Sequence, residues 1–306
     1  MNDNEFNSSN NSQRNVRIIG GKNLVKLTDV PDKPLYKTIL VSLIATDGTE
    51  VDQQKIERSD NALSYSLPHV PAGRYTLRVM RKTDPNSSWF YDWISQVPIA
   101  VGSDRMVRFE KSPVYDDNVN FFGKMKADRT TIEQYKAMPR GDNADIIKKA
   151  YQITHGCFTD YAKALAIHDW IADNIYYDYD SYYSNRIDYS KLGSAAAVYR
   201  NKLAVCCGYS NLAVIMLRAV GIPAYSASCY ALGVSTAGTW NRSNVNCDSN
   251  HAITLAYIQK RWIIMDITWD SGNKYENGQL QHTNDTRHRY FDPTLQCFSN
   301  THRFCA

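Results

Sequence analysis

The run VCCGYS at residues 205–210 is the feature that most constrains this chain. The residues after it are rich in Leu, Ala, Ile and Met at spacings of three and four, which predicts a helix that ends at Gly221. A thiol at the start of a helix lies at the positive end of the helix dipole, which favours the nucleophilic thiolate. The run therefore predicts a reactive cysteine, although the helical period alone leaves both Cys206 and Cys207 open.

Two later residues supply the groups that such a thiol needs. His251 opens a strand-like run at 251–258, and Asp266 lies inside a second one at 262–269. If Gln259-Lys260 forms the tip of a hairpin, His251 and Asp266 become diagonal neighbours on one face of the sheet. A three-residue bulged loop would instead place them on opposite faces. In the first register the order is that of a nucleophile, a base and an orienting carboxylate, as in cysteine-based acyl transfer.

Composition bounds the remaining possibilities for the 306 residues. Lys and Arg outnumber Asp and Glu by 35 to 31, and no segment forms a basic stripe, so we expect no nucleic-acid partner. No apolar run is long enough to span a membrane, and the polar first sixteen residues do not resemble a signal peptide. The seven cysteines include no CxxC pair and form no zinc pattern with histidine, so we expect no metal and no cofactor.

The order of elements predicts an α+β fold preceded by a small β-sandwich. Residues 1–33 suggest a flexible polar leader, or what remains after removal of a signal. Short strand-like runs with turn signals, such as Asp47-Gly48, predict an immunoglobulin-like sandwich over 34–112 that serves as an accessory domain. Residues 113–150 suggest a helical connector. In 151–306, helices are followed by strands, as expected of an α+β catalytic domain.

Four sequence blocks resemble the transglutaminase-like superfamily of papain-like thiol enzymes, in particular its bacterial branch. They are AKALAIHDWIADNIYYD at 162–178, VCCGYSNL at 205–212, NHA at 250–252 and WIIMDITWD at 262–270. The resemblance covers about residues 150–306. It implies that Cys206 is the nucleophile, His251 the base and Asp266 the third member of the triad. Cys207 departs from the residue types expected at its position in the family pattern.

The resemblance implies activity on peptide or protein amides, most simply protease-like hydrolysis. Transamidation or deamidation of protein glutamine is the close alternative. A non-catalytic surface module, with the sandwich engaging a protein or cell-surface partner, is the alternative from another class. By analogy with other proteins that carry a sandwich before such a domain, an extracellular or cell-surface location is favoured.

Further side chains receive weaker predictions. Trp269, Tyr209, Trp240 and Tyr177 are expected to support substrate binding, with Trp240 as part of a lid formed by the loop 232–249. A disulfide between Cys229 and Cys247 would tether that loop, and Cys297 with Cys305 is a second candidate pair. The other histidines are expected at the surface or in satisfied hydrogen bonds: His69, His155, His168, His282, His288 and His302.

Overall fold

The fold is given by a computed structural model. It describes residues 3–11, 16–58, 62–82, 86, 88, 90–125, 127–139, 141–233, 239–283 and 286–305. Helices and strands are mixed, which confirms the predicted α+β class. The chain divides into two compact units, each built from several segments. The first unit comprises Met1–Asn118, Leu232–Asn246 and Pro293–Arg303, and the second comprises Val119–Ala231, Cys247–Asp292 and Phe304–Ala306.

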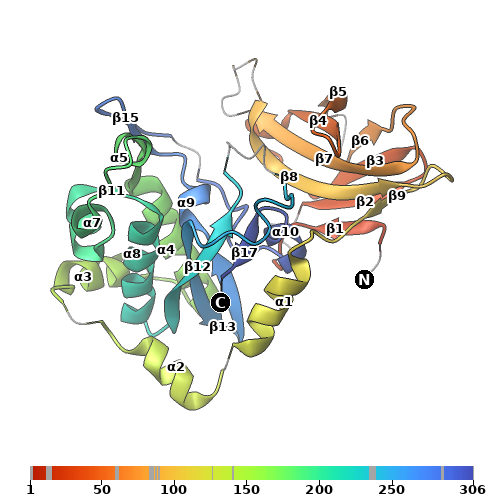
Figure 1. The fold of residues 1–306 in the computed structure, drawn as a ribbon. Helices are drawn as coiled ribbons and strands as arrows, with labels where there is room; N and C mark the ends of the chain where they lie inside the picture. The colour runs from red at the N-terminus through yellow and green to blue at the C-terminus, as the bar shows by residue number, and fades with distance from the viewer. Residues whose placement is uncertain are drawn as a thin grey trace. The chain divides into compact units, whose positions relative to one another are not determined.

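The first unit is a sandwich of two antiparallel sheets (Figure 1). One sheet has the order β1-β2-β3-β6, with strands Glu5–Asn7, Arg17–Gly21, Leu24–Thr28 and Ala62–Ser66. The other has the order β5-β4-β7-β8-β9, with strands Glu50–Glu57, Thr38–Ala45, Gly73–Lys82, Phe90–Val101 and Val107–Phe109. Buried side chains of both sheets form one hydrophobic cluster, so the sheets pack face to face. The unit also contains the 3-10 helix η1 (Pro34–Tyr36) and the helix α10 (Leu295–Phe298).

The sandwich begins earlier in the chain than the sequence suggested. Residues 1–33 were expected to be a flexible leader, yet they contribute three of the four strands of one sheet. Among their polar residues stand Phe6, Ile18, Val25 and Leu27, all fully buried. Apolar residues alternate here with polar ones, which is the pattern of a half-buried strand. The average composition of the segment does not report this alternation. Residues 1, 2 and 12–15 of the expected leader lie outside the described part of the chain.

The second unit packs helices around a central helix and an antiparallel sheet. Strands β12 (Ala224–Ala231), β13 (His251–Ile258) and β14 (Arg261–Met265) lie in the order β14-β13-β12. Helix α8 (Cys206–Ala219) lies beside these strands, with α3 (Ala144–Ile153), α4 (Asp160–Asn174) and α7 (Ala195–Asn201) around it (Figure 1). Nine residues of α8 are buried, so this helix forms the centre of the hydrophobic core.

Shorter elements complete the second unit. Before the core helices come α1 (Tyr115–Lys124), which begins in the first unit, and α2 (Arg129–Lys136). A small sheet has the order β11-β10-β15-β16, with strands Leu203–Ala204, Tyr176–Asp178, Lys274–Glu276 and Gln279–Gln281. The short helices are α5 (Tyr179–Tyr183), α6 (Tyr189–Leu192) and α9 (Ile267–Asp270), and the strand β17 (His302–Phe304) spans the boundary between the units.

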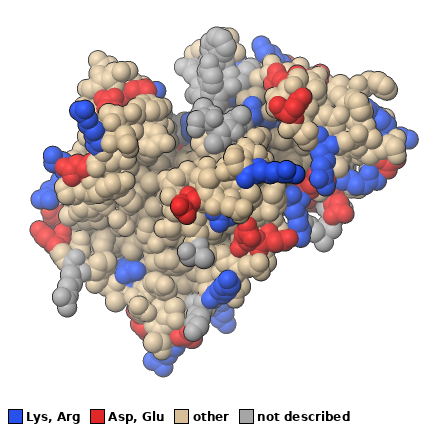
Figure 2. Space-filling view, viewed as in Figure 1, with Lys and Arg blue, Asp and Glu red and all other residues tan. Residues whose placement is uncertain are grey.

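Surface charge follows the balanced composition. On the face shown in Figure 2, basic and acidic side chains are interspersed among uncharged residues. In the described parts of the chain, no helix combines the length and apolar character needed to cross a membrane.

Candidate active site

Cys206 is the first residue of helix α8. Val205 is the N-cap of that helix, and Cys206 follows it with its backbone in the first turn. The thiol therefore lies at the positive end of a fourteen-residue helix, as the sequence predicted. Gly208 allows this end of the helix to pack closely, because a Cβ at this position would lie 2.0 Å from the carbonyl oxygen of Leu192. The glycine of the VCCGYS run thus has a packing role beneath the thiol.

Ser210 connects the same helix to the sheet that carries the histidine. Its hydroxyl donates to the carbonyl oxygen of Ile253 in β13 at 2.8 Å and lies 2.9 Å from the hydroxyl of Ser226 in β12. The Thr254 hydroxyl donates to Ser210 Oγ at 3.1 Å. These buried hydrogen bonds set the position of α8 along β13, two residues from His251. This role of Ser210 could not be predicted from the sequence, since a serine in a helix carries no specific signal.

The hairpin β13–β14 has the register that was predicted. Ile258 pairs with Arg261 and Thr254 with Met265, with Gln259 and Lys260 as the two turn residues. Both turn residues have positive φ, 52° and 62°, which a two-residue turn of this type requires. The parity that places His251 and Asp266 on one face is therefore confirmed.

The second predicted strand is shorter than expected, and this changes the setting of Asp266. Strand β14 ends at Met265, and residues 267–270 form the helix α9 with Asp266 as its N-cap. The Asp266 side chain accepts a hydrogen bond from the backbone N–H of Trp269 at 3.2 Å. A strand over 262–269 was wrong because the apolar run also fits a helix turn started by a capping aspartate.

His251 and Asp266 are in direct contact. His251 Nε2 lies 2.9 Å from Asp266 Oδ2, and both side chains are buried. The backbone N–H of Asp266 donates to the carbonyl oxygen of Tyr290 at 3.1 Å, so the residue is held at its backbone and at both carboxylate oxygens. Asp266 thus contacts the Nε2 side of the His251 ring.

Cys206 and His251 lie close enough for each group to shift the pKa of the other. Burial opposes ionisation of the thiol, but the hydrogen bond to His251 and the charge of its ring outweigh it and lower the pKa of Cys206. Burial likewise opposes protonation of the ring, but the charge and hydrogen bond of Asp266, with the contact to Cys206, raise the pKa of His251 to about 10. These electrostatics favour a thiolate–imidazolium pair.

Cys207 lies in a different environment from its neighbour. Its sulfur is close to Gly193, where a Cβ would come within 3.2 Å of it. Burial, followed by the nearby Cys206, raises the pKa of Cys207. Of the two adjacent thiols, only Cys206 therefore has the contacts of a nucleophile.

The expected supporting residues fall into two groups. Tyr177 lies near the thiol: burial raises its pKa, and the next largest cause is the neighbouring Cys206. Trp269 packs against the triad, with its ring centroid 6.0 Å from that of His251. Tyr209, in contrast, is almost fully buried and donates its hydroxyl to the carbonyl oxygen of Ile175 at 2.8 Å, so it supports the fold and does not line a surface.

Trp240 belongs to the first unit. Its indole N–H donates to the carbonyl oxygen of Ser299 at 2.8 Å within that unit. Residues 234–238 of the loop in which a lid was expected lie outside the described residues. The lid stays a prediction.

Asn250, directly before His251, was not recognised as a functional residue from the sequence. Its side-chain oxygen accepts the N–H of Ala231 at 2.8 Å, and its side-chain amide donates to the Ala231 carbonyl oxygen at 3.1 Å. The amide thus imitates a backbone partner and extends the pairing of β12 with β13 to the point where His251 begins. Its place in the NHA block was the available signal.

None of the seven cysteines forms a disulfide, so neither predicted pair is present. Cys229 is buried opposite His251 in the β12–β13 pairing. Cys247 instead interacts with Tyr230, the next residue in β12. Successive residues of a strand point to opposite faces, so Cys229 and Cys247 lie on different sides of β12. Cys297 is buried in the core of the first unit, whereas Cys305 belongs to the second unit.

Comparison with known families identifies the segment that carries this site. Residues 147–267 match the family model described as Transglutaminase-like superfamily, and this range contains Cys206, His251 and Asp266. The match confirms the predicted resemblance over that range. No curated protein matches the chain.

Solved structures of three proteins illustrate the similarity. A proposed cysteine protease from Cytophaga hutchinsonii is 21% identical, with 76% of this chain and 71% of that chain covered and a TM-score of 0.35. The periplasmic domain of TgpA from Pseudomonas aeruginosa is 14% identical, with 76% and 87% covered and a TM-score of 0.35. Red sea bream transglutaminase is 11% identical, with 80% and 48% covered and a TM-score of 0.33, so this chain spans about half of its length. At such identities and TM-scores, only this chain's own side chains can support an activity.

Proposed function

We propose that the protein is a cysteine enzyme that hydrolyses peptide or protein amides, as the match of residues 147–267 to the transglutaminase-like superfamily model supports. Cys206 is the nucleophile, His251 the general acid and base, and Asp266 the residue that orients His251. The observation that carries the proposal is a buried imidazole that lies 2.9 Å from a carboxylate and close enough to the Cys206 thiol to lower its pKa.

The acylation step follows from these contacts. The Cys206 thiolate attacks the carbonyl carbon of the amide, and a carbon–sulfur bond forms. The negative oxygen of the tetrahedral intermediate is stabilised by backbone N–H groups at the start of α8, including that of Cys206. The carbon–nitrogen bond then breaks, and the imidazolium of His251 gives its proton to the departing amine.

Deacylation reverses the role of the histidine. Neutral His251 removes a proton from a water molecule, which attacks the thioester carbonyl carbon. The carbon–sulfur bond breaks, the carboxylic acid leaves, and the thiolate–imidazolium pair is restored. Asp266 stabilises His251 whenever its ring is protonated and keeps one ring nitrogen directed at the sulfur.

Alkylation tests the activation of the nucleophile without knowledge of the substrate. In the full chain, iodoacetamide at about pH 6 is expected to label Cys206 quickly, because an ordinary thiol is almost fully protonated there. His251→Ala should abolish this labelling. Cys207→Ala is the matched control, since it removes the adjacent thiol and should leave the rate at Cys206 unchanged. Labelling of Cys206 no faster than that of an ordinary thiol would favour a non-catalytic module.

The reaction type needs a second measurement. The protein is incubated with a peptide library and a primary-amine probe, and the products are identified by mass spectrometry. We expect cleaved peptides from the wild type and none from Cys206→Ala. Amine incorporation or glutamine deamidation that depends on Cys206 would show that the reaction is transamidation or deamidation and not hydrolysis. The roles assigned to the three triad residues would be unchanged.

A further inference from the structure

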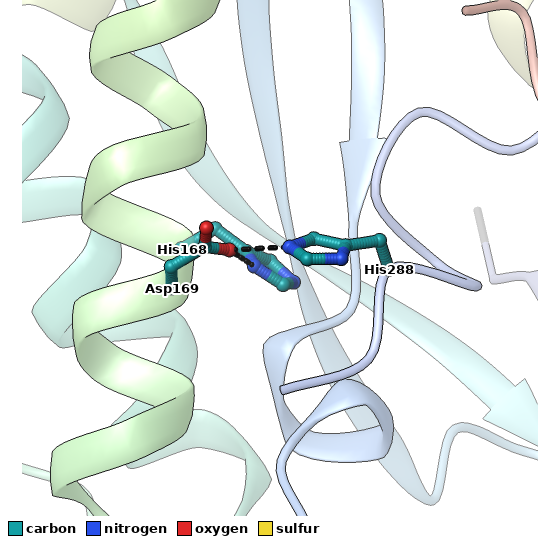
Figure 3. A group of neighbouring side chains, drawn as sticks. All are labelled: His168, Asp169 and His288. Atoms are coloured by element: carbon teal, nitrogen blue, oxygen red, sulfur yellow. Dashed lines mark hydrogen bonds and ion pairs between the residues drawn. The ribbon is translucent and has the colours of Figure 1, made fainter. Parts of the chain in front are cut away.

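Two histidines and an aspartate outside the triad converge in the second unit. His168 and Asp169 are neighbours in helix α4, and His288 lies in the segment that follows β16 (Figure 3). His168 Nδ1 is 2.9 Å from Asp169 Oδ1, and His288 Nε2 is 2.6 Å from the same oxygen. One ligand atom from each of the three residues lies within 4.8 Å of the other two. Three donors are thus gathered around one point.

A fourth residue holds His168 in the orientation of a metal ligand. His168 Nε2 is 3.1 Å from Asp270 Oδ2, and both side chains are fully buried. Asp270 in turn accepts the backbone N–H of Tyr290 at 3.1 and 3.0 Å. A carboxylate on one ring nitrogen, with the other directed at the donor cluster, is the outer-shell arrangement that metal-bound histidines use.

The ring positions also suit a single ion. The ring centroids of His168 and His288 are 5.4 Å apart. Two imidazoles on one tetrahedral ion, with metal–nitrogen distances of roughly 2.1 Å, place their ring centroids at a similar separation. The cluster is open on one side, since the side chains of Asp169 and His288 are 41% and 23% exposed. A water molecule from that side can fill a fourth position.

We propose that His168, Asp169 and His288 form a binding site for Zn²⁺. Two imidazole nitrogens and one carboxylate are a donor set that suits zinc and similar divalent transition metals, whereas Ca²⁺ and Mg²⁺ prefer oxygen ligands. The sequence did not indicate this site, because His288 is separated from the other two ligands by more than a hundred residues and no local spacing pattern links them.

The site would have a structural consequence for the triad. A metal ion there ties the segment containing His288 to helix α4. Two residues later, Tyr290 accepts the backbone N–H of Asp266 at 3.1 Å. The ring of Tyr290 also contacts that of Trp269, at a centroid distance of 5.5 Å. Zinc would therefore fix the segment against which Asp266 is held.

Metal titration of the full chain tests the proposal. The Cys206→Ala variant is used so that the reactive thiol does not bind the probe. The protein is treated with chelator, dialysed and titrated with Co²⁺, a spectroscopic substitute for Zn²⁺, and then with Zn²⁺ by calorimetry. We expect one ion per chain and a cobalt spectrum of nitrogen and oxygen ligation, without thiolate-to-metal charge transfer.

Two variants in the same background locate the ion. His288→Ala should weaken binding by at least about tenfold. His282→Ala is the matched control, because His282 is also a partly exposed histidine, 3.8 Å from Asp173 but outside the cluster. Asp169→Asn, which keeps the size of the side chain, repeats the test if His288→Ala lowers the melting temperature of the metal-free protein. The proposal would be overturned if no metal bound or if thiolate bands appeared in the cobalt spectrum. It would also be overturned if both cluster variants bound the metal as tightly as the protein with the intact cluster.

Discussion

Asp266 performs two tasks with its two carboxylate oxygens. One oxygen faces His251 Nε2, and the other caps helix α9 through the N–H of Trp269. Replacement by alanine would remove both contacts and confuse electrostatic with structural effects. Asparagine also serves as an N-cap, so Asp266→Asn keeps the cap and removes the charge.

The Asp266→Asn variant tests the electrostatic role of this charge. Without it, the pKa of His251 falls from its raised value of about 10, and less imidazolium is present near neutral pH. Asp266 also disfavours the thiolate directly, but this effect is smaller than that of the His251 hydrogen bond. We therefore expect the midpoint of the pH profile for Cys206 alkylation to move up by about one pH unit or more. An unchanged midpoint would contradict the assigned role of Asp266.

For individual residues, much of the site was predictable from the sequence, because its chemistry depends on short local patterns. The VCCGYS run indicated the reactive thiol, and hairpin parity indicated the contact between His251 and Asp266. Side-chain bonds to backbone groups, such as those of Ser210 and Asn250, were not predictable, since their partners are distant in sequence. The disulfide between Cys229 and Cys247 failed because spacing along the chain does not report the face of a strand.

Among the elements, helix α8 depends on a close contact at Gly208. Gly208→Ala should destabilise the second unit by about 1–3 kcal/mol, because the new Cβ would lie 2.0 Å from a backbone oxygen that cannot easily move. Thermal unfolding measures the effect.

The matched control for that substitution is Gly123→Ala in helix α1. A Cβ there meets no atom within 4 Å, so the higher helix propensity of alanine should stabilise the protein by up to about 1 kcal/mol. Equal changes in melting temperature for the two variants would show that the close approach at Gly208 does not limit packing.

Element boundaries were predicted less well than element types. Strand β5, EVDQQKIE, has no clear strand pattern in the sequence, because it is polar and lies at the edge of its sheet. The strand over 262–269 was divided into β14 and α9 by the capping of Asp266. In both cases tertiary position decided between structures that the local pattern allowed.

For the whole molecule, the N-terminal residues are part of a folded unit. Phe6 is fully buried, and its ring lies 6.0 Å from that of Phe109. Phe6→Ala should therefore destabilise the sandwich by about 3–5 kcal/mol. The measurement is the melting transition of the full chain, with Lys26→Ala as the control, because Lys26 is exposed on strand β3. A Phe6→Ala variant as stable as the control would restore the view of a flexible leader.

The division into units also differs from the predicted domains, which assigned 151–306 as one piece. In the structure, two segments of this range, 232–246 and 293–303, belong to the first unit. Composition along the chain could not predict this, because each segment is short and is recognised only by the residues it packs against. Cys297, for example, is buried in the hydrophobic cluster of the sandwich.

The position of residues 293–303 in the first unit has a consequence for biosynthesis. A ribosome makes the strands of the sandwich before it makes Cys297 and its neighbours, which follow most of the second unit along the chain. The sandwich therefore acquires its full set of core contacts only after most of the second unit has been synthesised. Until then, nascent chains would expose an unfilled position in that core to the cell's chaperones.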